Sequence, residues 1–255
     1  MRVDTPSILS LAVGALLSWA PPAMAGAAAP EATLPEPGAE AGSAFSGELS
    51  LGYDTFYIFR GEELFEEVSW RQVMLSMALS DSLSFTLTTW NATAAADNYI
   101  ELDFLPTLTW DAGFAEFTAG FAHYNFLRGA FGGGEGMATE REANLSVAKS
   151  FGIFDTSLLA VYNFNRDAVY YEAGVGTSIG LSKFASLVPS VNVGYSSEYF
   201  GADGLSHVLL TLSLPLQLTE TATLTPYLAG NIPLNMLDEI QDPELFGGVA
   251  FAVSF

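Results

Sequence analysis

From about residue 45 onward, apolar residues alternate with small or polar ones, and breaks interrupt this alternation at regular intervals. The pattern is clearest at Val208, Leu210 and Leu212, and again over residues 248–255. Successive side chains of a strand point to opposite faces, so a period of two predicts β-strands with one apolar face. Beyond the N-terminal segment there is no run of about 18 apolar residues, so the sequence predicts no transmembrane helix.

The breaks alternate between short and long, which is typical of a transmembrane barrel with short periplasmic turns and long outer loops. Short breaks fall near residues 80–82, 111–113, 150–153, 181–183 and 218–221, and long ones at 60–67, 92–98, 127–142, 164–168, 197–205 and 231–244. Five short and six long breaks predict twelve strands, with both chain ends on the periplasmic side. The expected strands are 45–59, 68–79, 83–92, 99–110, 114–126, 143–150, 154–163, 169–180, 185–196, 206–217, 222–230 and 245–255.

Aromatic residues gather at the ends of these strands, as expected for rings that sit at the two interfaces of a membrane. Tyr57 and Phe59 flank a long break, while Phe154 and Phe255 flank the short-break side. We therefore expect an all-β fold, a closed antiparallel transmembrane barrel built as an up-and-down meander, whose apolar face points at lipid. Phe59 shares the parity of Leu49, so it is expected on that lipid-facing side.

Four prolines fall inside the expected strands, and each removes a hydrogen bond from the ladder. They are Pro106, Pro189, Pro215 and Pro226. Each lies near a short break, which leaves the middle of each strand free of proline. A soluble β-sandwich is the alternative, because alternation alone does not say whether the apolar face meets lipid or a protein core.

The N-terminal 25 residues have the features of a cleaved signal peptide. An apolar run over residues 8–20 is too short to span a bilayer, and Ala23-Met24-Ala25 resembles a cleavage site. Residues 26–44 are rich in Ala, Pro, Glu and Gly and predict a flexible periplasmic leader, with the barrel over residues 45–255. The final Phe255, with apolar residues at every second position before it, resembles the signal read by the barrel-insertion machinery. Together these features indicate the outer membrane of a Gram-negative bacterium.

Composition narrows the classes of function. The formal net charge of −21 disfavours binding to nucleic acid. The absence of cysteine removes thiolate chemistry and cysteine metal sites. We expect no cofactor. The partners expected are outer-membrane lipid and lipopolysaccharide, together with small cationic or neutral solutes.

One short motif stands out at the end of the first expected strand, Tyr57-Ile58-Phe59-Arg60-Gly61. With Gln72 and the later Trp90-Asn91, it resembles the Gcw_chp family of exported barrel proteins from Gram-negative bacteria, and the similarity runs over roughly residues 45 to 126. That resemblance implies a barrel and assigns no substrate. Gly61 is expected to open a tight turn.

Several charged residues share the parity of the face that would line the lumen. The candidate pore-lining residues are Asp54, Arg60, Glu101, Asp103, Glu116 and Glu172. Carboxylates along a pore attract cations, so a continuous lumen would prefer cations, with Arg60 at a constriction and paired to Asp54, Glu101 or Asp103. The alternative is that these groups hydrogen-bond to one another and fill the barrel. Small residues at lumenal positions such as Gly174, Gly194 and Gly248 favour open space, or they make room for large neighbours.

A second acidic set falls in the expected outer loops and includes Glu140 and Glu142. Its simplest interpretation is a solvated surface beside lipopolysaccharide. A calcium site is a weaker alternative, because the spacing of the four carboxylates matches no EF-hand. Those carboxylates are Asp238, Glu239, Asp242 and Glu244.

The sequence offers little for catalysis. Ser206 precedes His207, but adjacent strand residues are expected to face opposite sides. We therefore do not expect an enzyme. The leading hypothesis is a narrow, cation-preferring channel or uptake pore for small solutes. The alternatives are a non-conducting structural or surface-interaction barrel that acts through acidic loops, and a lipid-modifying barrel enzyme that would use His207.

Overall fold

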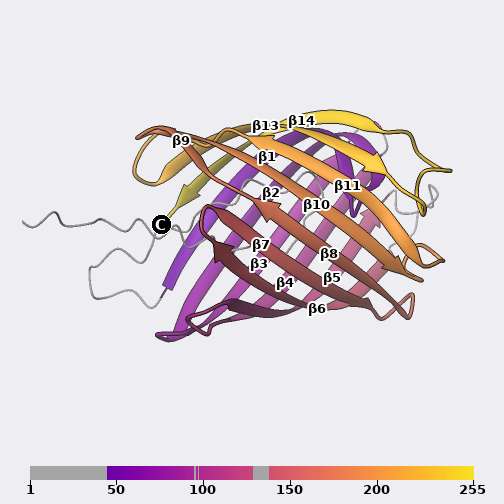
Figure 1. Ribbon diagram of the computed structural model, residues 1–255, viewed down its shortest axis with the longest axis horizontal. Coiled ribbons are helices and arrows are strands. Elements are labelled where there is room, and N and C mark those ends of the chain that lie inside the picture. The colour runs from indigo at the N-terminus through magenta and orange to yellow at the C-terminus, as the bar shows by residue number, and fades with distance from the viewer. Residues whose placement is uncertain (1–44, 95, 97, 129–137) are drawn as a thin grey trace, which may run out of the picture.

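The computed structural model describes residues 45–94, 96, 98–128 and 138–255, and this part of the chain is all β. The predicted signal peptide and leader, residues 1–44, lie outside it. In the described residues, no helix has the length and apolar character needed to cross a bilayer. A single antiparallel sheet contains all the strands (Figure 1).

The sheet has fourteen segments. They are β1 (Phe45–Phe59), β2 (Glu62–Ser80), β3 (Leu83–Ala94), β4 (Tyr99–Asp111), β5 (Glu116–Arg128), β6 (Ala138–Phe151), β7 (Phe154–Asn163), β8 (Ala168–Gly176), β9 (Ile179–Ser182), β10 (Ala185–Ser197), β11 (Gly204–Ser213), β12 (Leu216–Gln217), β13 (Ala222–Pro233) and β14 (Glu244–Ser254). Because β9 continues β8 and β12 continues β11, the fourteen segments make twelve strands of a barrel.

Both interruptions lie at or against a proline. The break between β11 and β12 contains Pro215 itself, and the break between β8 and β9 faces Pro189, whose carbonyl accepts from the Thr177 amide at 3.1 Å. A proline offers no amide donor, so it weakens the ladder at these points. The prolines thus split two strands near the end of the barrel, as their positions predict, without opening the wall.

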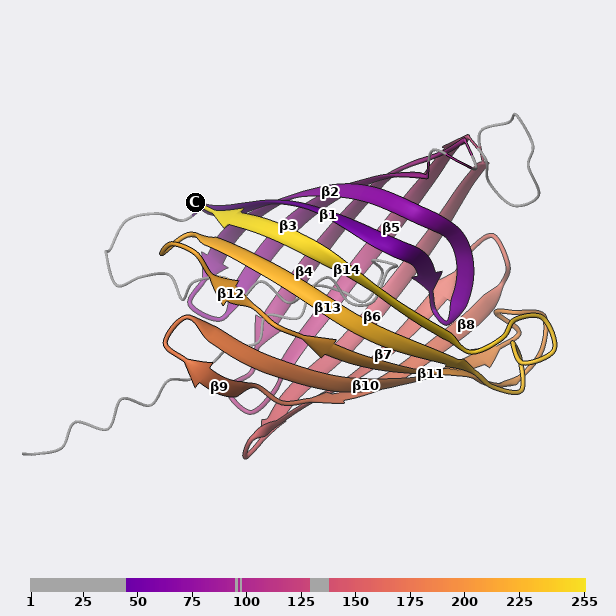
Figure 2. The ribbon, with the colours of Figure 1, turned by 90° about the horizontal axis from the view of Figure 1, so that it is seen from above.

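The barrel closes where the first strand pairs with the last. The β1–β14 register runs from Glu48 opposite Ser254 to Asp54 opposite Gly248. Two further backbone hydrogen bonds, each 2.9 Å, join Phe255 and Gly47. Consecutive strands pair around the rest of the wall, so the closed twelve-strand meander predicted from the sequence is confirmed (Figures 1 and 2).

The polarity of the barrel is opposite to that of a soluble protein. On β1, Leu49 and Leu51 are 48% and 53% exposed, whereas Glu48 and Asp54 on the other face are 2% and 3% exposed. A water-soluble fold buries its leucines and exposes its carboxylates. An apolar outside and a polar inside are the mark of a barrel in lipid, so the soluble sandwich is ruled out.

The two ends of the barrel differ. We call the end that carries the C-terminus and the connections 81–82, 112–115, 152–153, 183–184 and 218–221 the turn end; in Figure 1 it lies at the left. The opposite end is the loop end; it carries the described connections 60–61, 164–167, 198–203 and 234–243, and the strand ends at Ala94, Tyr99, Arg128 and Ala138.

Two boundary predictions are wrong at the loop end. The sequence predicts a long loop over residues 60–67, but β2 begins at Glu62 and only Arg60 and Gly61 form the turn. The break expected over 127–142 is shorter, because β6 already begins at Ala138; residues 129–137 lie outside the description. As a result Glu142 belongs to the barrel wall.

Candidate functional site

The end of the β1–β2 hairpin bends inward over the loop end of the lumen, and we call residues 56–66 the mouth hairpin. The pairing register shifts between Tyr57 and Ile58, and Glu67 has a positive φ of 51°. Irregularities of this kind insert extra residues into one strand and bend it. In Figure 2 the ends of β1 and β2 curve away from the neighbouring strands of the wall.

A two-residue turn closes the mouth hairpin. Arg60 and Gly61 have φ values of 52° and 87°, the pattern of a turn whose two central residues are both left-handed. A Cβ on Gly61 would lie 2.3 Å from Cγ of His207, so glycine is required for space as well as for conformation. The prediction that Gly61 opens a tight turn is confirmed.

The tip of the mouth hairpin is held from several parts of the wall. Asn231 on β13 donates to the Gly61 carbonyl at 2.7 Å, and Gln241 from the next loop donates to the same oxygen. The Glu63 amide donates to the Gln241 side chain at 2.9 Å. Ile58 packs in a buried cluster with residues of β13 and β14. These contacts fix the tip on one side of the mouth.

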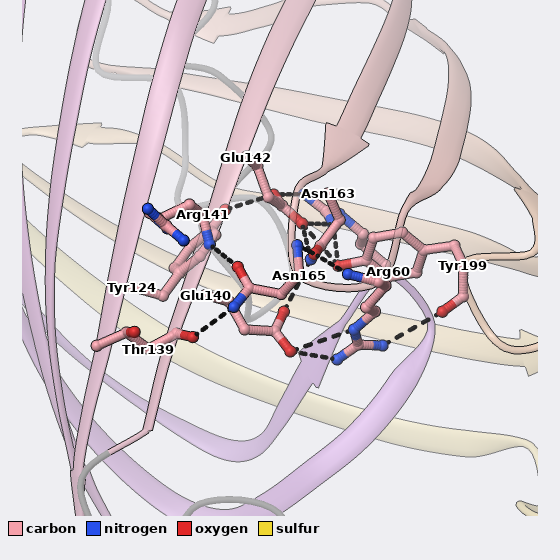
Figure 3. Close-up of polar contacts among 10 residues, drawn as sticks. Arg60, Tyr124, Thr139, Glu140, Arg141, Glu142, Asn163, Asn165 and Tyr199 are labelled. Carbon is pink, nitrogen blue, oxygen red and sulfur yellow. Dashed lines mark hydrogen bonds and ion pairs between the residues drawn. The ribbon is translucent and has the colours of Figure 1, made fainter.

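On the other side, Arg60 reaches across to Glu142 on β6. Its two terminal nitrogens donate to the two carboxylate oxygens at 2.7 Å and 2.5 Å, and both side chains are 1% exposed. Glu142 accepts three further hydrogen bonds, from Tyr124 at 3.1 Å, Tyr199 at 2.8 Å and Asn163 at 3.0 Å (Figure 3). A buried charge pair is stable only when its remaining hydrogen-bonding capacity is satisfied, and this carboxylate meets that condition.

Aromatic rings enclose the same guanidinium. Its carbon lies 4.5 Å, 5.0 Å and 4.8 Å from the ring centres of Phe59, Tyr170 and Tyr199. These distances are within the range of favourable cation–π contacts. Burial raises the pKa of the Tyr199 phenol above its ordinary value, so its hydroxyl stays protonated and donates to Glu142.

A second Arg–carboxylate pair lies nearer to solvent. Arg166 donates from two nitrogens to one oxygen of Glu140, at 2.9 Å and 3.2 Å, and the side chains are 27% and 16% exposed. The Arg166 guanidinium lies 4.9 Å from the Tyr199 ring, which therefore contacts both arginines.

A second group of buried carboxylates lies on β4, near its start at the loop end. Glu101 accepts from Tyr57 at 2.9 Å and from Tyr99, while Asp103, two residues along on the same face, is 1% exposed. The Tyr57 ring stacks on Trp90 with centres 5.5 Å apart. The mouth hairpin thus supplies a tyrosine to the β4 carboxylates and an arginine to β6.

The remaining predicted site residues also lie on the lumenal face. Asp54 accepts from Trp70 at 2.9 Å and from Tyr227 at 2.5 Å, and Glu172 accepts from Tyr170 at 2.7 Å. Glu116 is only half-buried and lies at the turn end, away from the others. Five of the six predicted residues are buried. Asp54 lies further along β1 from the mouth, and the other four lie toward the mouth: Arg60, Glu101, Asp103 and Glu172.

Three sequence-based expectations about this site are wrong. Arg60 pairs with Glu142 and with none of its three predicted partners. Tyr57 is 3% exposed and Phe59 packs against the buried cluster, so neither ring faces lipid. The sequence pattern predicts Glu142 in an outer loop, but the residue lies on β6. It shares parity with the lumenal Ser146, so extending the alternation upstream of residue 143 identifies it as lumenal.

Small lumenal residues are covered by their neighbours. A Cβ on Gly174 would lie 2.3 Å from the Asn192 side chain, and one on Gly248 would lie 2.3 Å from that of Asp54. One on Gly194 would meet Ser206 at 2.4 Å. At these three positions the small residues make room for neighbouring side chains and do not leave open space, as the second of the two sequence-based interpretations predicts.

Two other candidates gain no support. Among the described residues no three His, Asp or Glu side chains gather in a way that could hold a metal, and these residues include the acidic loop 238–244. Ser206 and His207 are both buried and hydrogen-bonded at 3.0 Å, because the register shifts at this point, so the expectation that they face opposite sides is wrong. Within the described chain, no carboxylate hydrogen-bonds to the ring to complete a triad.

Comparison with known proteins gives the fold and no family. No family model and no curated protein matches the chain. The KdgM porin in complex with disordered oligogalacturonate is 7% identical, with a TM-score of 0.51 over 82% of this chain and 99% of that one. An outer membrane channel from Pseudomonas putida F1 is 12% identical, with a TM-score of 0.52 over 83% and 95%.

LpxR from Salmonella typhimurium is equally similar in shape, at 8% identity and a TM-score of 0.52 over 82% of this chain and 99% of that one. At such low identities these matches report architecture alone. The chain has the fold of the outer-membrane β-barrels.

Proposed function

We propose that the protein is a narrow outer-membrane pore for small solutes, with a preference for cations, and that the mouth hairpin constricts its entrance. The loop end faces the outside of a Gram-negative cell and the turn end faces the periplasm. The observation that carries the proposal is the excess of acidic over basic side chains inside the barrel. Among the described residues, six carboxylates and one arginine are buried there: Glu48, Asp54, Glu101, Asp103, Glu142, Glu172 and Arg60.

An excess of carboxylates along a narrow passage favours cations and repels anions. Arg60 is already neutralised by Glu142, so it does not offset the charge of the other carboxylates. The passage is narrow in this conformation, because the mouth hairpin and its aromatic partners occupy the loop end. We therefore expect small currents that grow when the mouth hairpin moves.

The test is planar-bilayer conductance of the refolded chain under a salt gradient, which reports both current and ion selectivity. The reversal potential should indicate cation preference, and the double change Glu101→Gln, Asp103→Asn should move it toward zero. The matched control, Asp81→Asn with Glu220→Gln, removes the same charge from exposed positions at the turn end and should leave selectivity unchanged. Equal shifts in both proteins would show that the β4 carboxylates do not set selectivity.

A second candidate, a non-conducting structural barrel, is favoured by how completely the mouth is filled. Glu142 alone accepts five hydrogen bonds, and the Gly61 carbonyl accepts two. A folded protein that carries no current, both intact and with its mouth hairpin shortened, would establish this candidate in place of the pore.

A further inference from the structure

We propose that the cage around the Arg60 side chain is a recognition site for small guanidino compounds, which Arg60 occupies as a tethered competitor. This deepens the proposed pore and rests on it, because it names the class of solute the mouth would bind. The cage consists of Tyr124, Glu142, Asn163, Tyr170 and Tyr199.

The chemistry of the cage selects a planar cation. Glu142 presents both oxygens to two nitrogens of one group, and this bidentate geometry suits a guanidinium better than an ammonium. Tyr170 and Tyr199 offer ring faces about 5 Å from the charge, where a flat, weakly hydrated cation is favoured. A methylammonium ion could neutralise the Glu142 charge, but it has no second nitrogen to pair with the second carboxylate oxygen.

The cage is built without the mouth hairpin. Glu142 lies on β6, and its neighbours Tyr124, Asn163 and Tyr170 lie on β5, β7 and β8, while Tyr199 belongs to the loop before β11. When Arg60 leaves, Glu142 still accepts from Tyr124, Tyr199 and Asn163. The wall therefore holds the carboxylate in place for another occupant.

Arg60 itself fits the cage imperfectly. Its Nε is buried and has no hydrogen-bond partner among the described residues, although both terminal nitrogens are satisfied. It also has a left-handed backbone, which is unfavourable for a residue with a side chain. A tethered side chain with one unsatisfied donor and a strained backbone is an occupant that a free molecule of matching chemistry can replace.

The outer pair extends the same chemistry toward solvent. Glu140 holds Arg166 at partly exposed positions, and Tyr199 lies against both guanidinium groups. A guanidino solute that enters from the loop end would meet Glu140 first and Glu142 next, with the same ring beside both.

The first test uses the full chain with Arg60→Asn, which removes the guanidinium and leaves Asn-Gly, the dipeptide most favoured in this type of turn. Unfolding of the refolded barrel is followed with and without millimolar methylguanidinium chloride. The ion should raise the unfolding midpoint, since a ligand that binds only the folded state stabilises it. Methylammonium chloride at the same concentration should give no such shift.

The matched control is the double variant Arg60→Asn, Glu142→Gln, which should lose the response to methylguanidinium. An equal shift with methylammonium, or a shift that survives Glu142→Gln, would overturn the proposal. This measurement needs no current, so it stays informative if the pore hypothesis fails.

The second test is made on the unmodified sequence in bilayers. Methylguanidinium should compete with Arg60, release the mouth hairpin and raise the current several-fold, while the Glu142→Gln variant should not respond. Stabilisation of the Arg60→Asn variant without any current in either protein would retain the site and reject the pore. Currents that ignore methylguanidinium, with no stabilisation, would retain the pore and reject the site.

Discussion

At the scale of single residues, the turn of the mouth hairpin shows how a local strain is tolerated. Arg60 adopts a left-handed φ, which for a residue with a Cβ costs about 1 kcal/mol or more. The bidentate ion pair with Glu142 and the cation–π contacts with three aromatic rings offset that cost. Gly61 carries no such strain, but it leaves no room for a side chain against His207.

This predicts that Gly61→Ala weakens the docked mouth hairpin by about 1–3 kcal/mol, because it adds backbone strain and a collision with His207. Gly113→Ala is the matched control, since Gly113 has a φ of 78° but nothing within 4 Å of the new Cβ. Urea unfolding of the two refolded variants should show a lower midpoint for Gly61→Ala. Equal losses would mean that the contact with His207 contributes nothing.

The ion pair gives a second residue-scale prediction. Glu142→Gln leaves the Arg60 charge buried without its partner, a change that costs about 3–5 kcal/mol when the group cannot reach water. Adding Arg60→Asn should recover much of that loss, because neither charge of the pair then remains buried. Unfolding of both single variants and the double variant forms a thermodynamic cycle, and simple additivity would contradict a direct coupling between the two side chains.

At the scale of elements, alternation located the wall well and the mouth poorly. The predicted strands 45–59 and 154–163 agree with β1 and β7, and the four prolines were correctly associated with the turn end. Parity failed at Tyr57 and Phe59, because the bulge beside Tyr57 turns the strand end inward. A bulge inserts one residue, and a single sequence does not reliably indicate where that happens. The burial of the Tyr57–Gly61 motif therefore could not be predicted from the alternation.

The mouth hairpin as an element can be removed without cutting the wall. Residues 57–65 lie beyond the Phe56–Glu66 pair, so replacing them with Asn-Gly leaves the lower parts of β1 and β2 joined by a favoured turn. If the mouth hairpin constricts the entrance, this variant should fold and carry a current several-fold larger than that of the unmodified chain. The measurement is single-channel conductance, with heat-modifiable migration on gels as the check on folding. An unchanged current in a folded variant would show that the constriction lies elsewhere.

At the scale of the whole molecule, the barrel closes because its first strand, β1, pairs with its last strand, β14. The β1–β14 ladder continues through Phe255, whose amide and carbonyl both bond to Gly47 at 2.9 Å. The Phe255 ring also lies over Gly47, where a Cβ would meet it at 2.6 Å, yet 71% of the residue remains exposed on the lipid-facing side. The Phe255 backbone can therefore stabilise the finished barrel, while its ring can be recognised during assembly.

Substitution and deletion separate these tasks. Phe255→Ala keeps both backbone bonds, so the purified barrel should lose less than about 1 kcal/mol on urea unfolding, whereas deleting the residue removes two bonds at about 1 kcal/mol each. If the insertion machinery reads the ring, Phe255→Ala should nevertheless sharply reduce the amount of assembled barrel in cells. Phe154→Ala, which removes a ring that is 50% exposed at the same end, should not. Equal assembly of the two variants would mean that the ring is ordinary lipid-facing surface, and that closure depends only on the backbone ladder.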